Sequence, residues 1–168
     1  MRAVRGVWAI AAVATLLCLL PVGPAGARER RGCHPAGSKT VAVAAGARVF
    51  KSRDGRMYGC LKAVGRPRYL WAPSPRPEEE TAFDLPRLAG PYAGFVDYWC
   101  DSAGLHVAHV RVVDLRSGGV HASLPALSVP PIPHERQRVV ALNLAADGSA
   151  SWTATLAGLT EVHAGVSR

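Results

Sequence analysis

Hydrophobic residues beyond residue 38 come in short runs, and Gly, Pro or Asp-Gly dipeptides separate one run from the next. The clearest run is 149–156, where Trp152, Ala154 and Leu156 fall on one face and polar residues lie between them. A period of two residues is typical of a strand with one buried and one solvated face. Helical periodicity is scarce after residue 27, so the pattern predicts an all-β fold of about eight or nine strands.

Two Asp-Gly dipeptides, Asp54-Gly55 and Asp147-Gly148, predict tight hairpin turns. Residues 72–80 and 123–138 are rich in proline, which cannot donate a hydrogen bond inside a sheet, so both segments are expected to be loops. The remaining segments are expected to form strands arranged as hairpins or meanders. They are residues 39–50, 56–63, 66–71, 91–100, 106–115, 139–144, 149–156 and 160–164.

The first 27 residues differ from the rest of the chain. Arg2 and Arg5 precede an uncharged apolar run at 7–20, and the small residues Ala-Gly-Ala stand at 25–27. This order predicts a secretory signal peptide over residues 1–27, and therefore a secreted protein. The apolar run has 14 residues, short of the roughly 20 that span a bilayer as a helix, and an uncleaved anchor is the alternative. After cleavage we expect a flexible segment at 28–39, a single all-β domain at 40–164 and no contact with the membrane.

Three cysteines follow the predicted signal peptide: Cys33, Cys60 and Cys100. Exported proteins meet an oxidising environment, so one disulfide and one remaining thiol are expected. We predict the pair Cys33–Cys60, with Cys60–Cys100 as the alternative and Cys100 otherwise a buried thiol. Closing the Cys33–Cys60 loop would stabilise the fold by roughly 3 kcal/mol, because it restricts the unfolded chain.

The chain carries a formal net charge of +8, and its 17 arginines far outnumber its 3 lysines. The basic residues are spread along the sequence and do not gather in one stripe, and the abundance of Ala, Gly, Val, Pro and Arg is typical of a high-GC bacterial genome. Because arginine codons are common in such genomes, we do not attribute the charge to nucleic-acid binding and expect no nucleic-acid partner.

Two short segments resemble the strand-and-turn phrases of β-propeller blades. Residues 112–118 read Val-Val-Asp-Leu-Arg-Ser-Gly, and residues 142–152 run from Leu142 through Asp147-Gly148 to Trp152. On these phrases, residues 40–164 resemble secreted bacterial β-propeller-like proteins of the TolB or WD40-like kind. The resemblance implies antiparallel blade-like sheets. Propellers need at least about four blades to close a ring, and this chain has material for two or three, so a partial propeller is expected, with a β-sandwich as the alternative.

Candidate catalytic and metal motifs fail when their spacing is checked. His106 and His109 would point to opposite faces of a strand, so they are not expected to bind one metal ion together. Residues 32–40 only superficially resemble a phosphate loop, because Ser38 interrupts the required order and a strand follows. Asp114 is expected to stabilise the turn before Ser117. We therefore assign no catalytic residue, no metal site and no cofactor.

Aromatic residues of the predicted strand 91–100 offer a binding surface. Tyr92, Tyr98, Trp99 and the neighbouring Asp97 are the candidate binding residues, with Trp71 as a further aromatic. The favoured function is a non-catalytic binding or structural module, whose partner would be another protein or a cell-envelope glycan.

Two other functions stay open. One is an exported hydrolase acting through carboxylates such as Asp97 and Asp101. The other is a small secreted enzyme inhibitor that presents one proline-rich loop, 72–80 or 123–133, to its target. The sequence leaves the oligomeric state undetermined.

Overall fold

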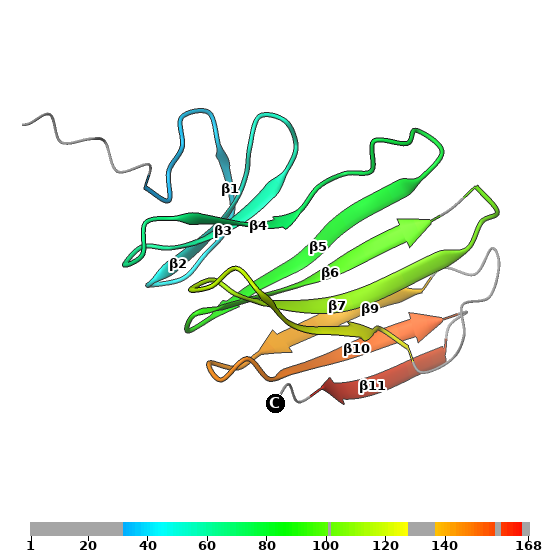
Figure 1. The fold of residues 1–168 in the computed structure, drawn as a ribbon. Helices are drawn as coiled ribbons and strands as arrows, with labels where there is room; N and C mark the ends of the chain where they lie inside the picture. The colour runs from blue at the N-terminus through cyan, green and yellow to red at the C-terminus, as the bar shows by residue number, and fades with distance from the viewer. Residues whose placement is uncertain (1–31, 101, 128–136, 157–158, 166–168) are drawn as a thin grey trace, which may run out of the picture.

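A computed structural model describes residues 32–100, 102–127, 137–156 and 159–165, with only the backbone described at 159 and 161–165 (Figure 1). Across these residues the chain forms eleven strands and no helix, which confirms the predicted all-β fold. It follows that this part of the chain holds no helix long and apolar enough to cross a membrane. The predicted signal peptide, residues 1–27, lies outside the described residues.

The strands form three antiparallel sheets, each a meander in which consecutive strands are neighbours. The N-terminal sheet contains β1 (Lys39–Val43), β2 (Ala47–Lys51), β3 (Met57–Leu61) and β4 (Pro67–Trp71). The central sheet contains β5 (Glu80–Ala89), β6 (Tyr92–Cys100), β7 (His106–Asp114) and β8 (Val120–Pro125). The C-terminal sheet contains β9 (Arg138–Leu144), β10 (Ala150–Leu156) and β11 (Leu159–Gly165).

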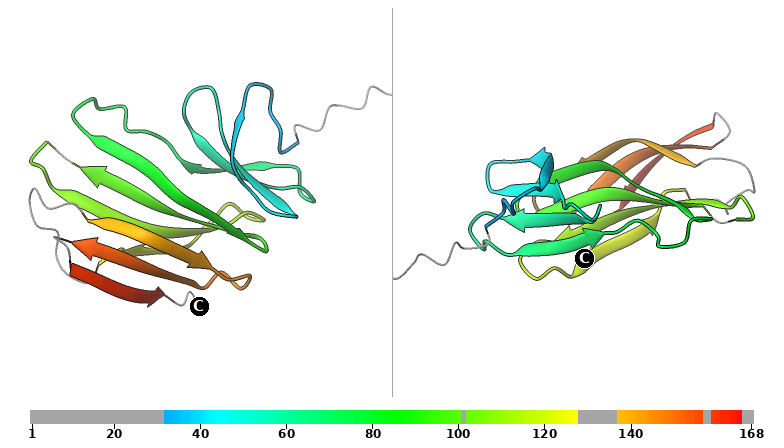
Figure 2. Two further views of the ribbon diagram at one scale, coloured as in Figure 1. Left: turned by 180° about the vertical axis from the view of Figure 1, so that it is seen from behind. Right: turned by 90° about the horizontal axis from the view of Figure 1, so that it is seen from above.

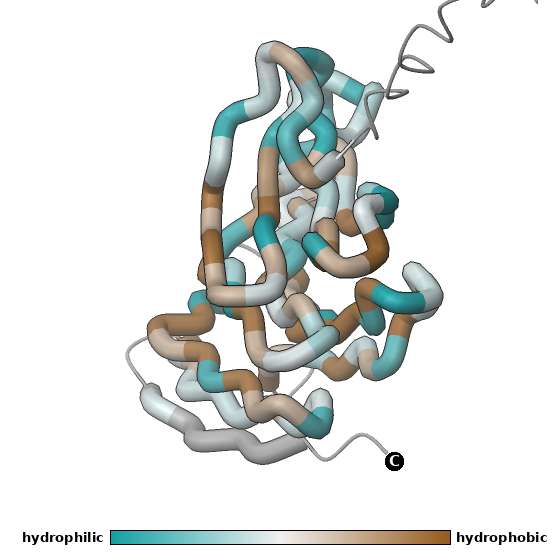
Figure 3. Tube along the Cα trace, turned by 90° about the vertical axis from the view of Figure 1, so that its left-hand side faces the viewer, coloured by the Kyte–Doolittle hydropathy of each residue, from teal (hydrophilic) through white to brown (hydrophobic). Residues whose placement is uncertain are grey.

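The central sheet lies between the other two (Figure 2). It buries side chains on both of its faces. Phe95 of β6 faces the N-terminal sheet, where it packs in one core with Val49 and Leu70. The next residue, Val96, faces the C-terminal sheet and belongs to a second core with Leu142 and Trp152. Figure 3 shows hydrophobic and hydrophilic residues interspersed along the traces. Removal of apolar surface from water on both faces holds the three sheets together.

Strand β10 follows the predicted alternation along its whole length. Its residues at even positions from Ala150 to Leu156 are buried, and those at odd positions are partly exposed. Trp152 anchors the strand, since its indole nitrogen donates a 2.8 Å hydrogen bond to the Ala126 carbonyl oxygen while the ring fills the core. The final predicted strand, 160–164, is β11.

Three strand predictions need correction. The segment 39–50 is two strands, because Ala44 and Ala47 exchange backbone hydrogen bonds that close a turn between β1 and β2. Strand β5 was not predicted, and it tolerates Pro86 because it lies at the edge of its sheet. Its pairing with β6 shifts register around Leu85, which has a φ of 48°. Strand β8 was also missed, since its end overlaps the segment expected to be a loop.

The predicted disulfide joins Cys33 to Cys60 with an S–S distance of 2.04 Å. Beside it, the buried Arg48 side chain donates hydrogen bonds to the Cys33 carbonyl oxygen and to Thr40 Oγ1, and its guanidinium lies over the Phe50 ring. Together these contacts fasten the segment before β1 onto the outer face of the N-terminal sheet.

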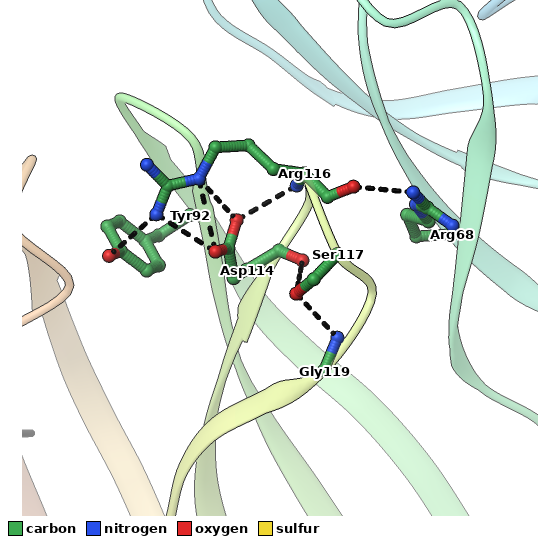
Figure 4. Close-up of polar contacts among 6 residues, drawn as sticks. All are labelled: Arg68, Tyr92, Asp114, Arg116, Ser117 and Gly119. Atoms are coloured by element: carbon green, nitrogen blue, oxygen red, sulfur yellow. Dashed lines mark hydrogen bonds and ion pairs between the residues drawn. The ribbon is translucent and has the colours of Figure 1, made fainter.

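The β7–β8 turn is built on Asp114, as the sequence predicted (Figure 4). Its carboxylate accepts hydrogen bonds from the backbone and side chain of Arg116, and this arginine holds the pKa of the Asp114 carboxyl below its usual value. Arg116 also donates to the Tyr92 hydroxyl at 3.1 Å, and its carbonyl oxygen accepts from Arg68 of the N-terminal sheet. The turn therefore links two of the three sheets.

Candidate ligand-binding groove

The N-terminal sheet packs against only one end of the central sheet. Beyond it, the same face of β6 and β7 carries Asp97, Trp99, Val107, His109 and Arg111, because Asp97 pairs with His109 and Trp99 with Val107 across the two strands. These side chains line a cavity of about 370 Å³, whose opposite wall is the end of β4. We call this cavity the aromatic groove. Its volume falls within the usual range of ligand pockets, roughly 300–1,000 Å³.

Asp97 is the fixed polar centre of the aromatic groove. Its Oδ1 accepts a 2.9 Å hydrogen bond from Trp71 Nε1, and its Oδ2 forms a 2.9 Å ion pair with Arg111 Nη2. The Asp97 side chain is 16% exposed and that of Arg111 is 37% exposed, so both can reach a ligand. Because each carboxylate oxygen has a protein partner, the group is oriented before any ligand arrives.

A row of aromatic rings holds Trp71 in place. The Trp71 ring lies 6.1 Å from that of Phe83, which in turn stacks on the buried Phe95 ring at 4.7 Å. The Trp71 indole therefore packs against Phe83, which stacks on the core residue Phe95, and its nitrogen is hydrogen-bonded to Asp97. Few rotamers are left for it to lose when a ligand binds.

Two aromatic residues that line the groove are exposed: Trp99, with 36% of its surface accessible, and Tyr69 of β4, with 55%. Trp99 stands on β6 between Thr81 of β5 and Val107 of β7. A large, rigid and partly exposed ring at a cavity rim is the kind of side chain that anchors a bound partner.

The β4–β5 linker, residues 72–79, forms one wall of the groove. Ser74 orders it, because its backbone nitrogen donates to Thr81 Oγ1 at 2.9 Å and its hydroxyl donates to Glu79 Oε2 at 2.7 Å. Arg76 adds a 2.8 Å ion pair to Glu79. The hydrogen bond from Ser74 makes the largest contribution to lowering the pKa of the Glu79 carboxyl. Hydrogen bonds from Arg76 and Trp99 lower this pKa further.

His109 is a further polar group of the groove, and its surroundings favour the neutral imidazole. Burial lowers its pKa, as does the neighbouring Arg111 guanidinium, whereas Asp97 acts in the opposite direction. A neutral imidazole has one donor and one acceptor nitrogen, which suits recognition of hydroxyl groups. As the strand period predicted, His106 lies on the other face, where its Nε2 is 3.5 Å from Cys100 Sγ. In the described part of the chain, no group of three or more His, Cys, Asp or Glu side chains could hold a metal ion.

A larger cavity of about 760 Å³ adjoins the aromatic groove. Four of the described residues line both cavities: Ser74, Thr81, Trp99 and Val107. The larger cavity continues past the edge of β5 to Tyr98, Cys100 and His106, and reaches Arg138 at the start of β9.

The predicted binding residues separate into two groups. Asp97 and Trp99 lie in the aromatic groove. Tyr92 is 9% exposed on the opposite face, with its ring 4.8 Å from that of His121. Tyr98 is half-buried on that face, its hydroxyl accepts a 2.9 Å hydrogen bond from the Val139 backbone nitrogen, and burial raises its pKa.

Two sequence candidates cannot be placed in the groove, and one residue of the groove was not predicted. Asp101, proposed as a hydrolytic carboxylate, lies outside the described residues, as does most of the loop 123–133. Arg111 was missed, and the only signal for it was its position two residues after His109 on a predicted strand. That spacing puts both on one face, but it does not show that the face is uncovered.

Comparison with protein-family models, with curated proteins and with solved structures finds no match to this chain. The function is therefore inferred from the geometry of the site.

Proposed function

We propose that this protein is a secreted, non-catalytic binding module that holds a glycan in the aromatic groove. The observation that carries the proposal is the position of Trp71 and Trp99 beside the Asp97–Arg111 ion pair on an uncovered part of a sheet. Sugar rings present apolar C–H faces and hydroxyl edges. Aromatic surface beside fixed donors and acceptors complements both.

The chemistry of Asp97 favours binding over hydrolysis. A general acid or nucleophile needs an oxygen that is open to the reacting bond, and a glycosidase needs a second carboxylate at a defined distance. Both Asp97 oxygens contact protein donors. The same contacts leave the remaining lone pairs of the carboxylate oriented to accept hydrogen bonds from ligand hydroxyl groups.

Two features support secretion. The Cys33–Cys60 disulfide fits a protein that matures in an oxidising compartment. The order of charged, apolar and small residues over 1–27 fits a signal peptide.

For the architecture, we propose three successive blade-like meanders in preference to a β-sandwich. The first strands of the three sheets follow one another in space, since β1 contacts β5 and β5 contacts β9. In a partial propeller of the TolB or WD40-like kind, the first strand of each blade would lie next to the first strand of the following blade in the same way. The polar residues Ser151, Thr153 and Thr155 on the far side of β10 would give the last blade a solvated outer face.

Retention on isolated bacterial cell-wall sacculi tests the proposed function. The native protein should sediment with the sacculi, and Trp99→Ala should remain in the supernatant because it loses the exposed ring. Leu124→Ala is the matched control, since Leu124 has the same 36% exposure but lies on β8, outside the groove. Equal retention of both variants, or no retention of the native protein, would contradict the proposal.

A further inference from the structure

The aromatic groove does not end at Trp99, and this extension indicates the size of the ligand. Ser74, Thr81, Trp99 and Val107 belong to both cavities, and neither cavity is enclosed. The exposed indole of Trp99 therefore stands at the junction of an open trough. A single sugar unit bound beside Trp71 would leave the larger cavity empty.

The charge of the trough differs from that of the whole protein. The chain as a whole carries a formal net charge of +8. Among the residues that the structure describes, the two cavities are lined by three basic side chains (Arg76, Arg111 and Arg138) and four acidic ones (Glu79, Glu80, Asp84 and Asp97). Two of the basic side chains are already paired with acids, Arg76 with Glu79 and Arg111 with Asp97. A polyanion would find no excess of positive charge on this described part of the lining, so the trough fits an uncharged polymer.

Both ends of the trough share one ordered wall. Pro73 and Pro77 of the linker line the larger cavity, Ala72 lines the aromatic groove, and Ser74 lines both. Proline restricts the linker backbone, and the hydrogen bonds from Ser74 to Thr81 and Glu79 fix its course. Since the wall is ordered in advance, a long ligand can contact it with little loss of conformational entropy.

We propose that the ligand is an uncharged, unbranched oligosaccharide of several units that lies across both cavities, with one sugar ring on Trp99 and its far end beside Arg138. The inference rests on the proposed function. It adds the length of the ligand, its lack of charge and its path from the aromatic groove to Arg138. A smaller ligand would be held by Trp71, Trp99 and Asp97 alone. A longer one would gain contacts in the larger cavity.

A homologous series of N-acetylglucosamine oligomers, from one to six units, tests the inference by titration calorimetry. These sugars are uncharged, linear and soluble. Affinity should rise with length, and the hexamer should bind at least about tenfold more tightly than the dimer, the change that about 1.4 kcal/mol would give. Arg138→Ala should weaken hexamer binding several-fold and leave dimer binding unchanged. Arg66→Ala is the control, because Arg66 is an exposed arginine that lines neither cavity.

The outcomes separate this inference from the proposed function. If the monomer binds as tightly as the hexamer, or if Arg138→Ala matches Arg66→Ala at every length, the ligand does not cross both cavities and the inference is wrong. If sacculi retain the protein through Trp99 but no oligomer binds, the inference is wrong while the proposed function stands. If sacculi do not retain the protein either, both are wrong.

Discussion

Replacing Gly59 with alanine tests how closely the N-terminal sheet approaches the central sheet. Gly59 lies on β3, and a Cβ atom added there would come within 2.5 Å of Leu115 Cδ2 and 3.3 Å of Leu70 Cδ1. Carbon atoms pack at about 3.5–4.0 Å, so the Leu115 methyl group would have to move by about 1 Å. Leu115 is fully buried, which leaves it no open space to move into.

Two opposing effects determine the size of the change. Alanine in a strand restricts the unfolded chain more than glycine does, which by itself would stabilise the protein by about 0.5–1 kcal/mol. Overpacking of a buried contact costs about 1–3 kcal/mol. The steric effect is the larger, so we expect Gly59→Ala to lower the free energy of unfolding by about 1–2 kcal/mol. With an m-value of about 2 kcal/mol/M, the urea midpoint would fall by about 0.5–1 M.

Urea unfolding followed by tryptophan fluorescence, with the disulfide intact, measures this change. Gly46→Ala is the control, because no atom lies within 4 Å of its added Cβ, and its midpoint should stay unchanged or rise slightly. Leu115→Val should relieve the clash, so the two changes combined should cost less than the sum of their separate effects. If Gly59→Ala were as stable as Gly46→Ala, the two sheets would not meet at Leu115.

Three further changes probe other parts of the fold. Replacing Cys33 and Cys60 with serine should lower the free energy of unfolding by about 3 kcal/mol in a urea titration, since a span of 27 residues is no longer closed; an unchanged midpoint would refute this. Trp152→Phe leaves the Ala126 carbonyl oxygen without its indole donor, and it should lower the free energy of unfolding by about 1–3 kcal/mol in the same assay. A loss no larger than that caused by Phe83→Leu would contradict the contribution of this hydrogen bond. Asp114→Asn should be less stable than the native protein at pH 7. The difference should shrink as the pH falls below the ordinary aspartate pKa of 3.8 and through the lower folded-state pKa, because protonation removes the same charge from Asp114. A difference that stays constant down to pH 2 would contradict the role of that carboxylate.

Elements with a local signal could be predicted from the sequence, and those that depend on neighbours could not. Strand β10 was predicted because Trp152 and its neighbours alternate with polar residues, and the Asp54-Gly55 hairpin because its turn dipeptide is specific. Strand β5 was missed since Pro86 argues against a strand, and only its place at a sheet edge makes the proline tolerable.

The candidate site shows the same limit. Asp97 and Trp99 could be selected because they are chemistry-bearing residues two positions apart on one predicted strand. Tyr92 and Tyr98, two other candidates, alternate onto the face that packs against the C-terminal sheet. No local pattern shows which face a neighbouring sheet covers. The pairing of Asp97 with Trp71 crosses 26 positions in the chain, so it arises only when the N-terminal sheet docks.

The register shift at Leu85 and the proline that follows it also affect how the folded protein behaves among copies of itself. A flat, regular edge strand offers a row of unpaired backbone groups on which another chain can add, and this is a common start of aggregation. In β5, Pro86 has no N–H to offer and the irregular pairing between Asp84 and Arg87 interrupts the row. The strand that borders the trough is therefore protected against sheet extension, so this edge can stay open to a ligand without recruiting a second molecule.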